Sequence, residues 1–226
     1  MASITDILDQ LKAKANPDNL EGMARFGMAV EKRLGVSVPE MRRIAKETGQ
    51  DHKLAVKLWK TGLAEARIVA SMIAVPEELT EKDMEAWVKD INSWDVCDQV
   101  CMNLFEKTPL ARQKIIEWSD REEEFVKRAA FALIAGLAWH DKQATDKEFI
   151  EFLPVIKRGA SDERNFVKKA VNWALRNIGK RNSRLNKAAI KTAKEIQRLD
   201  SKAARWIAAD ALRELEGEGA QKRLEK

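Results

Sequence analysis

The sequence contains no tyrosine and has only two cysteines, five prolines and ten glycines among its 226 residues. So few glycines and prolines argue against an all-β protein, which uses these residues in its many tight turns. Apolar residues make up 45% of the chain and charged residues 34%, so the composition is not that of a disordered protein. A chain of this length buries a sizeable core without disulfides or metals. The composition therefore favours an all-α fold.

No apolar run in the sequence is long enough to cross a membrane. The longest run, residues 129–139, has 11 residues, whereas a membrane-spanning helix needs about 20. The first six residues also lack the basic and apolar pattern of a secretory signal. We therefore expect a cytoplasmic protein without membrane contact.

The two cysteines, Cys97 and Cys101, stand one helical turn apart and do not provide a disulfide framework. This usage indicates a reducing compartment. The only histidines, His52 and His140, lie far from the cysteines in sequence, so the ligand set of a structural metal site is lacking. We expect no metal and no cofactor, and we expect both thiols to be small buried side chains.

Apolar residues recur with the period of an α-helix almost throughout the chain, and no segment alternates as a strand does. Thr80 and Thr145 are each followed three residues later by an acid, which is typical of helix starts. Gly49 and Gly62 follow helical segments and are typical of helix ends. The pattern predicts about a dozen helices joined by short connections.

Helices rich in small residues recur along the chain. Their opening residues lie at 65–70, 98–101, 125–130, 166–171 and 204–209. Each is preceded by another amphipathic segment, and two-helix units of about 30–45 residues are typical of an α-solenoid. One unit cannot bury its apolar face alone, so neighbouring units must stack. We predict one domain of HEAT-like two-helix repeats over residues 1–216, with a concave face formed by the second helices, and a frayed charged tail at 217–226.

Positive charge is concentrated between residues 164 and 198. This segment has 11 Lys or Arg and one acid, which gives it a net charge of +10 and leaves −5 for the rest of the chain. The alternative to a functional role is a solvated charged face. A net charge this large over 35 residues favours a polyanionic partner, above all the phosphate backbone of nucleic acid. Five basic residues are predicted to contact DNA: Lys168, Lys169, Arg176, Lys180 and Arg181.

Trp94 and Asp98 lie four residues apart and share one face of a predicted helix. Asp95 stands in the first turn of that helix, where a carboxylate interacts favourably with the helix dipole. Arg128 and Trp173 occupy similar places in the next two units, so Trp94, Asp98, Arg128 and Trp173 are expected to converge on the concave face. In the alternative interpretation Asp98 is a structural acid paired with Arg128. Four other tryptophans are expected in the core: Trp59, Trp87, Trp118 and Trp206.

Three elements in a fixed order carry a resemblance to a known family. They are Trp-Asp-x-x-Asp at 94–98, Arg-Ala-Ala at 128–130 and x-x-Trp-x-Leu-Arg at 171–176. Residues 23–26 and 35–43 extend it toward the N-terminus, so the resemblance runs through most of the chain. The sequence resembles the HEAT-like-repeat DNA alkylation repair glycosylases, the AlkD family.

The resemblance implies an enzyme that excises cationic N3- and N7-alkylated purines from duplex DNA without a metal or cofactor. Asp98 would stabilise positive charge on the deoxyribose in an oxocarbenium-like transition state and help to position the attacking water. Trp94 and Trp173 would flank the lesion nucleotide, and Arg128 would hold a nearby phosphate. Phe26 stands where the family pattern has Tyr, so an aromatic face remains without its hydroxyl group. Nothing in the sequence demands more than a monomer.

Two other functions remain open. A non-catalytic HEAT-repeat protein that binds distorted or branched DNA would use the same basic segment. A scaffold of the general HEAT type would bind an acidic protein partner and would have no length-dependent affinity for DNA. Release of a methylated base from duplex DNA distinguishes the glycosylase from both.

Overall fold

The computed structural model describes residues 2–224, and within this range it contains helices and no β-strand. The all-α prediction is confirmed. None of the helices in that range is long and apolar enough to span a lipid bilayer. The chain divides into two compact units, Met1–Ala111 and Arg112–Lys226.

The first unit is built from seven α-helices and two short 3-10 helices in its described residues. The α-helices are α1 (Ile4–Ala13), α2 (Asp18–Arg25), α3 (Val38–Thr48), α4 (His52–Trp59), α5 (Ala64–Ile73), α6 (Glu81–Asp90) and α7 (Trp94–Asn103). The 3-10 helices are η1 (Pro76–Glu78) and η2 (Phe105–Lys107).

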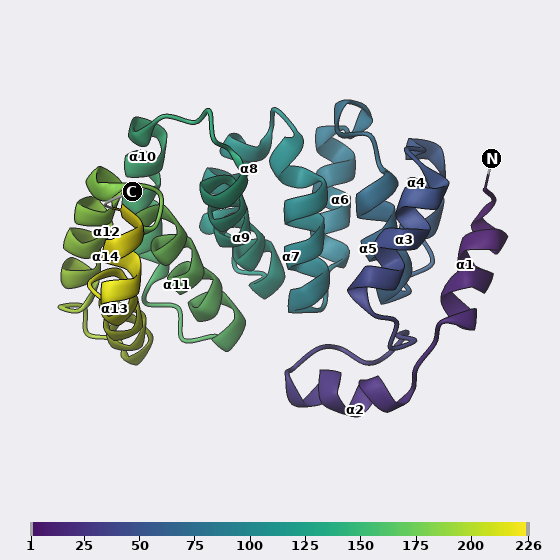
Figure 1. Cartoon of the computed structure of the whole chain (residues 1–226), viewed down its shortest axis with the longest axis horizontal. Helices are drawn as coiled ribbons and strands as arrows, with labels where there is room; N and C mark the ends of the chain where they lie inside the picture. The colour runs from purple at the N-terminus through teal and green to yellow at the C-terminus, as the bar shows by residue number, and fades with distance from the viewer. Residues whose placement is uncertain (1, 225–226) are drawn as a thin grey trace. The chain divides into compact units, whose positions relative to one another are not determined.

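Helix α5 is the centre of the first unit, because α3, α4 and α7 all pack against it (Figure 1). Eight of its ten residues are buried. Trp59 of α4 stacks on Trp87 of α6 with ring centroids 4.2 Å apart, which joins these two helices. Helix α2 has no buried residue and lies across the ends of the other helices (Figure 1). Helix α2 is therefore a surface helix of the first unit, and it ends next to Phe26.

The second unit contains the remaining helices, of which the first starts at the unit boundary. They are α8 (Ala111–Ser119), α9 (Glu124–His140), α10 (Asp146–Gly159), α11 (Asn165–Gly179), α12 (Ser183–Ile196), α13 (Lys202–Leu215) and α14 (Glu218–Leu224). Helices α9, α11 and α13 pack side by side, and α10 and α12 pack together and against α11. Twelve of the 17 residues of α9 are buried.

The predicted repeat starts fall in α5, α7, α9, α11 and α13, so the two-helix periodicity is confirmed. Helices α6 and α10 begin directly after Thr80 and Thr145, as expected. Gly49 ends α3 with a φ of 74°, and Gly62 follows α4 with a φ of 72°. The local sequence therefore predicts where these helices begin and end.

The side chains expected in the core are buried with one exception. Cys97 and Cys101 are buried free thiols. The aromatic side chains of Trp59, Trp87 and Trp118 are buried as well. The expectation is wrong for Trp206, which is 41% exposed, because it projects from the first turns of α13 toward solvent.

Helix α14 lies in the segment that the sequence analysis expected to fray. The side-chain amide of Gln221 donates to the backbone carbonyl of Leu215 at 2.6 Å and to the side-chain carbonyl of Asn186 at 3.3 Å. The predicted tail also includes residues 225 and 226, which lie outside the described residues.

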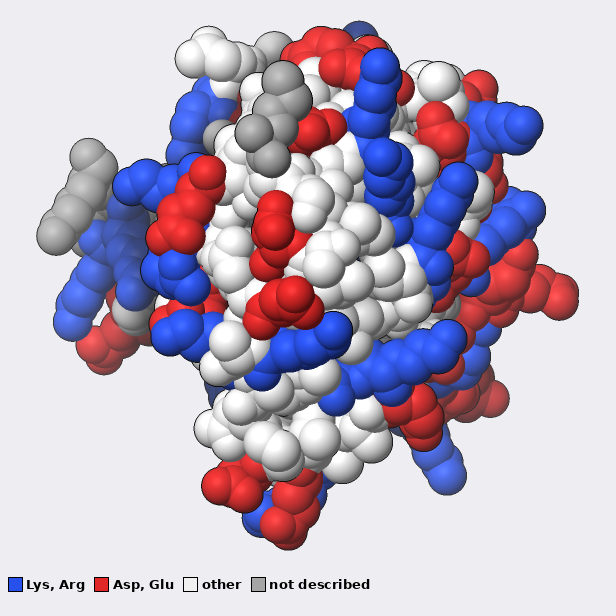
Figure 2. Space-filling model, turned by 90° about the vertical axis from the view of Figure 1, so that its right-hand side faces the viewer, with Lys and Arg blue, Asp and Glu red and all other residues white. Residues whose placement is uncertain are grey.

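One end of the first unit shows how evenly charge is distributed there. Lys and Arg side chains are interspersed with Asp and Glu around a central area that is mostly white but includes several acidic side chains (Figure 2). No single sign of charge dominates this face, in contrast to the basic segment of the second unit.

Gly35 should be the least replaceable glycine of the first unit. Its φ is +77°, and a Cβ added to it would lie 2.1 Å from the carbonyl oxygen of Asn16. Gly49 has a similar φ of +74° but open space around it, so Gly49→Ala is a control for backbone strain alone. We expect Gly35→Ala to lower the free energy of unfolding by about 2–4 kcal/mol and Gly49→Ala by about 1–2 kcal/mol. Urea denaturation measures both, and equal losses would contradict a role for the Asn16 contact.

Candidate nucleic-acid interface

The start of α7 holds Trp94 beside the exposed end of α2. The indole Nε1–H of Trp94 donates a 3.1 Å hydrogen bond to the backbone carbonyl of Phe26. Phe26 caps the C-terminus of α2, and its side chain is 75% exposed. The structure therefore brings together two aromatic residues that the sequence separates by 68 positions. An exposed ring such as that of Phe26 is suited to stacking on nucleic-acid bases.

A buried ion pair fastens the segment after α2 to the first turn of α7. The guanidinium of Arg33 donates to both carboxylate oxygens of Asp95, at 2.7 Å and 3.0 Å. The Arg33 side chain is 2% exposed and that of Asp95 14%. Ser93 donates to Asp95 and accepts from the amide of Ala29 at 3.2 Å. Asp95 was expected to interact with the helix dipole, and its main partner is this arginine.

Glu65 holds the next residues of the same segment. Its side chain is fully buried, and one carboxylate oxygen accepts from the amides of Leu34, Gly35 and Val36 at 3.0, 2.9 and 3.3 Å. Three converging N–H groups stabilise a carboxylate that is shielded from water. The path from Phe26 to α3 is therefore fixed by two buried charged side chains, Arg33 and Glu65.

Asp98 lies one turn after Trp94 on the same helix. Four residues of separation place the two side chains on one face of α7. Asp98 is 9% exposed. A carboxylate that is largely removed from water acts on a nearby positive charge through a lower effective dielectric constant than a solvated one. This placement suits electrostatic stabilisation of a cation.

In the second unit, Arg128 and Trp173 come from the packed helices α9 and α11. Arg128 is 5% exposed and donates to the backbone carbonyl of Phe166 at 2.6 Å, at the start of α11. Trp173 is half-buried. That these two side chains converge with Trp94 and Asp98 stays a prediction.

Lys168 and Lys169 lie in the first turns of α11. Lys169 is exposed, and Lys168 is half-buried with its ammonium 5.0 Å from the centroid of the Trp206 ring. Arg164, just before α11, pairs with Asp162 at 2.6 Å. The start of α11 therefore places two lysines at the surface, one of them next to the exposed Trp206 of α13.

Arg176 and Lys180 meet acids on α13. Arg176 pairs with Asp210 at 3.1 Å and also contacts Glu214, and Lys180 pairs with Glu214 at 3.0 Å. Burial acts to raise the pKa of the Glu214 carboxyl, but Lys180 and Arg176 outweigh it and hold that pKa below its ordinary value. Asn172 also donates to Asp210, at 2.7 Å. The basic charge of α11 is thus partly neutralised within the fold.

Arg181 has a structural environment. Its guanidinium donates to the carbonyl of Ala138 at 2.8 Å and lies 4.2 Å from the centroid of the Phe149 ring. These contacts satisfy a carbonyl at the C-terminal end of α9 and join it to α10. They direct this cation toward the protein rather than toward a ligand.

The acids that neutralise the basic residues of α11, and the charged side chains that anchor the segment between α2 and α3, were not predicted from the sequence. Arg33 and Glu65 each find their partners about 30 to 60 positions away, and no local pattern indicates such pairs. Asp210 and Glu214 carry a weak signal, because they stand four residues apart and so share a face of α13.

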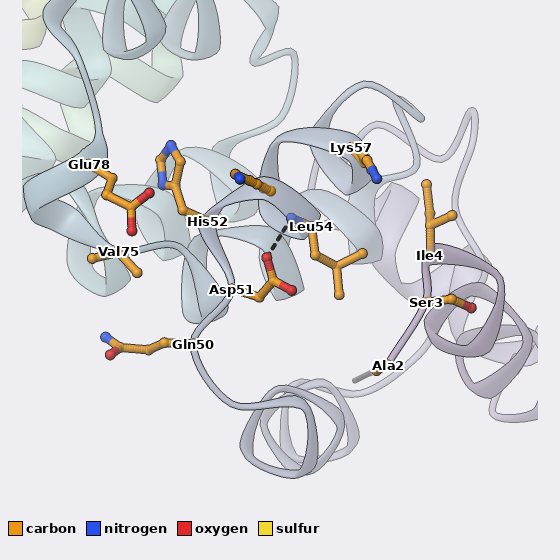
Figure 3. A pocket seen from close by; sticks show the side chains of 11 residues that line it. Ala2, Ser3, Ile4, Gln50, Asp51, His52, Leu54, Lys57, Val75 and Glu78 are labelled. Atoms are coloured by element: carbon orange, nitrogen blue, oxygen red, sulfur yellow. Dashed lines mark hydrogen bonds between the residues drawn. The ribbon is translucent and has the colours of Figure 1, made fainter.

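A hollow of the first unit lies at the N-termini of α1 and α4, apart from the residues considered above (Figure 3). Asp51 accepts from the amide of Leu54 at 2.9 Å there, and His52 Nδ1 has no hydrogen-bond partner among the described residues. Lys57 and Glu78 also line it. Because side chains of both signs face this hollow, it favours neither an anion nor a cation.

Loss of the Arg33–Asp95 pair should destabilise the first unit. Arg33→Met leaves the Asp95 carboxylate without its main partner, and we expect a loss of about 3–5 kcal/mol in the free energy of unfolding. Arg25→Met is the matched control, because Arg25 pairs with Glu21 where both side chains are at least 72% exposed, and it should cost less than about 0.5 kcal/mol. Urea denaturation tests both variants. Equal stability of the two would contradict the anchoring role of Arg33.

Known proteins resemble this chain in family and in fold. A family model described as DNA alkylation repair enzyme matches residues 7–215. A solved structure described as a new family of proteins related to the HEAT-like repeat DNA glycosylases, with affinity for branched DNA structures, superimposes with a TM-score of 0.80. It is 20% identical, with 99% of this chain and 96% of that chain covered.

Designed helical-repeat proteins are also among the matching structures. A designed armadillo repeat protein in complex with the peptide (KR)4 gives a TM-score of 0.36 at 15% identity, over 99% of this chain and 91% of that one. A search of curated proteins finds no match of significance. The matching fold is thus the HEAT-like repeat fold, and the extent of the family match shows that the chain belongs to the DNA alkylation repair enzyme family.

Proposed function

We propose that this protein is a DNA glycosylase that excises cationic N3- and N7-alkylated purines from duplex DNA. The observation that carries the proposal is the α7 cluster, by which we mean Phe26, Trp94 and Asp98. Trp94 donates a hydrogen bond to the backbone carbonyl of Phe26, whose ring is exposed, and it stands one helical turn before the buried Asp98 carboxylate. Its setting in a chain of the DNA alkylation repair enzyme family supports this assignment.

The proposed role of Asp98 follows from the chemistry of the substrate. An alkylated purine that carries a positive charge is already a good leaving group, so the reaction needs no strong general acid. As the glycosidic bond breaks, positive charge develops on the deoxyribose. The Asp98 carboxylate stabilises that charge and positions the water that attacks it. Its low exposure of 9% strengthens this interaction.

The aromatic side chains bind the lesion nucleotide in this proposal. Trp94 and Trp173 lie against the nucleotide and its sugar, and an aromatic face next to a cationic base adds about 0.5–2 kcal/mol of cation–π attraction. Phe26 supplies a further face for stacking. This mode of recognition favours cationic bases over neutral ones without a deep pocket.

The phosphate backbone is the remaining partner. We propose that Arg128, Lys168 and Lys169 contact phosphates, which gives affinity and register without reading the sequence. Arg176 and Lys180 contribute less, because Asp210 and Glu214 already neutralise part of their charge. No step of the proposed reaction uses a metal or a cofactor.

A second candidate function is non-catalytic binding of branched or distorted DNA. It is favoured by one observation, the described affinity of the structural neighbour for branched DNA. The α7 cluster argues for the glycosylase, because binding of the DNA backbone alone has no use for a buried carboxylate one helical turn from a tryptophan.

Asp98→Asn should abolish most excision and leave the fold and DNA binding intact. Asparagine is isosteric but neutral, so it removes the electrostatic stabilisation of the transition state. We expect single-turnover release of N7-methylguanine from a duplex with one lesion to fall about 100-fold or more. Asp120→Asn removes an exposed carboxylate elsewhere and should retain the wild-type rate.

Two outcomes would contradict the proposal in different ways. Unchanged excision by Asp98→Asn would contradict the role of this carboxylate. If the wild-type protein binds the duplex but releases no base, the non-catalytic function replaces the glycosylase.

Phe26→Ala should weaken DNA binding without destabilising the protein. Loss of one stacking aromatic costs about 1–3 kcal/mol of binding free energy, so we expect Kd for the lesion duplex to rise about 5- to 150-fold. Because the side chain is 75% exposed, the free energy of unfolding should change by less than about 0.5 kcal/mol. Phe26→Tyr keeps the aromatic face and should bind at least as well as the wild type. Fluorescence anisotropy measures Kd for the wild type and both variants, and urea denaturation measures their stability. If Phe26→Ala binds the lesion duplex as tightly as the wild type does, stacking by this ring is excluded.

A further inference from the structure

The basic segment that the sequence shows as one block is divided in the structure. Its first part lies on α11, where acids of α13 neutralise Arg176 and Lys180. Its second part lies on α12 and in the turn that follows it. Four of its exposed cations form what we call the α12 stripe: Lys187, Lys191, Lys194 and Arg198. The two parts belong to different faces of the second unit.

The α12 stripe follows one side of α12 and continues into the turn after it. Its residues stand at i, i+4, i+7 and i+11, which places them in one narrow sector. Ala189, Ala193 and Ile196 are buried on the opposite side. A Cβ on Gly179, at the end of α11, would lie 3.0 Å from Cβ of Ala189, so that opposite side packs on α11. The stripe therefore points away from α11 and from Lys168, Lys169 and Trp173.

Most of the charge on the α12 stripe is not neutralised by the fold. Lys194 pairs with Glu216 at 3.0 Å. The other three stripe residues form no ion pair among residues 2–224. The one acid beside the stripe, Glu195, pairs with Lys157 at 2.8 Å. That contact, with smaller effects from Lys191 and Arg198, lowers the pKa of the Glu195 carboxyl.

We propose that the α12 stripe binds the sugar–phosphate backbone of a DNA segment other than the one held at the α11 face. The stripe extends over about 16 Å at 1.5 Å per residue. One DNA strand presents a charge about every 3.4 Å, so about five phosphates lie within that length. This inference uses the proposed function only to choose DNA as the polyanion.

The composition of the stripe favours DNA over other anions. The exposed large apolar side chains of the described chain are Phe26, Ile116, Trp139 and Trp206, and none lies on α12. A membrane-surface helix needs an apolar face to insert beside its basic residues. The absence of aromatic residues also excludes base stacking by the stripe, so its contacts are independent of sequence.

The test compares two triple variants with the same change in charge. Lys187→Gln/Lys191→Gln/Arg198→Gln neutralises the unpaired part of the stripe. The control, Lys60→Gln/Lys82→Gln/Lys89→Gln, neutralises three exposed lysines of the first unit. Circular dichroism and thermal unfolding establish that both variants fold as the wild type does.

The assay is bridging of two undamaged duplexes, which needs no excision and so does not depend on the glycosylase assignment. A biotinylated duplex on beads is saturated with protein, and capture of a second, fluorescent duplex is measured. We expect the wild type and the control to capture it and the stripe variant to lose about 10-fold or more of the capture. The slope of log K against log salt for the second duplex should become shallower by about 2–3, because each phosphate contact contributes about 0.9.

Three results would overturn the inference. Equal capture by the stripe variant and the wild type would exclude DNA binding by the stripe. If the wild type binds one duplex and never captures a second, the stripe does not hold a separate segment. Binding of anionic phospholipid vesicles that is lost in the stripe variant, without any effect on DNA capture, would assign the stripe to a membrane surface.

Discussion

The structure depends on helices that are packed by neighbours on several sides at once. Eight of the ten residues of α5 and 12 of the 17 residues of α9 are buried. Such helices tolerate only small or apolar side chains along most of their length, because close packing leaves no room for voids or unsatisfied polar groups. Polar residues can therefore stand only where solvent, a turn or a fixed partner is near. This constraint concentrates them in the first turns of the second helices.

The candidate site follows from that constraint. Trp94 and Asp98 occupy the first two turns of α7, and Arg128 occupies the second turn of α9. The segment between α2 and α3 completes the first part of the site, although it has no regular structure of its own. Buried charged groups on Arg33 and Glu65 hold it in place. Because this segment is already fixed, little conformational entropy is lost when Phe26 binds a nucleotide. The surface is therefore preorganised for binding.

Charge is sorted by the tertiary structure rather than by the sequence. Arg176 and Lys180 near the end of α11 pair with Asp210 and Glu214, whereas the side chains of the α12 stripe are exposed to solvent. Ion pairs at α11 reduce the repulsion between its cations, which lie where helices pack closely. The cations of the α12 stripe are surrounded by solvent, which screens their repulsion. The same arrangement leaves Lys169 exposed at the start of α11. The second unit thus offers cations on two faces, each suited to phosphate contacts.

The sequence by itself determined the all-α fold, the two-helix repeat and the starts of the second helices, because apolar spacing and caps are local properties. It also identified Trp94 and Asp98 as neighbours on one helix face, since four residues of separation suffice for that. Only the tertiary structure decided that Arg33 neutralises Asp95, that Glu65 binds three amides of a distant turn, and that Trp206 faces solvent. The contacts of Arg33 and Glu65 join residues that are far apart in the sequence. Their energies depend on burial and distance, which no local pattern of residues encodes.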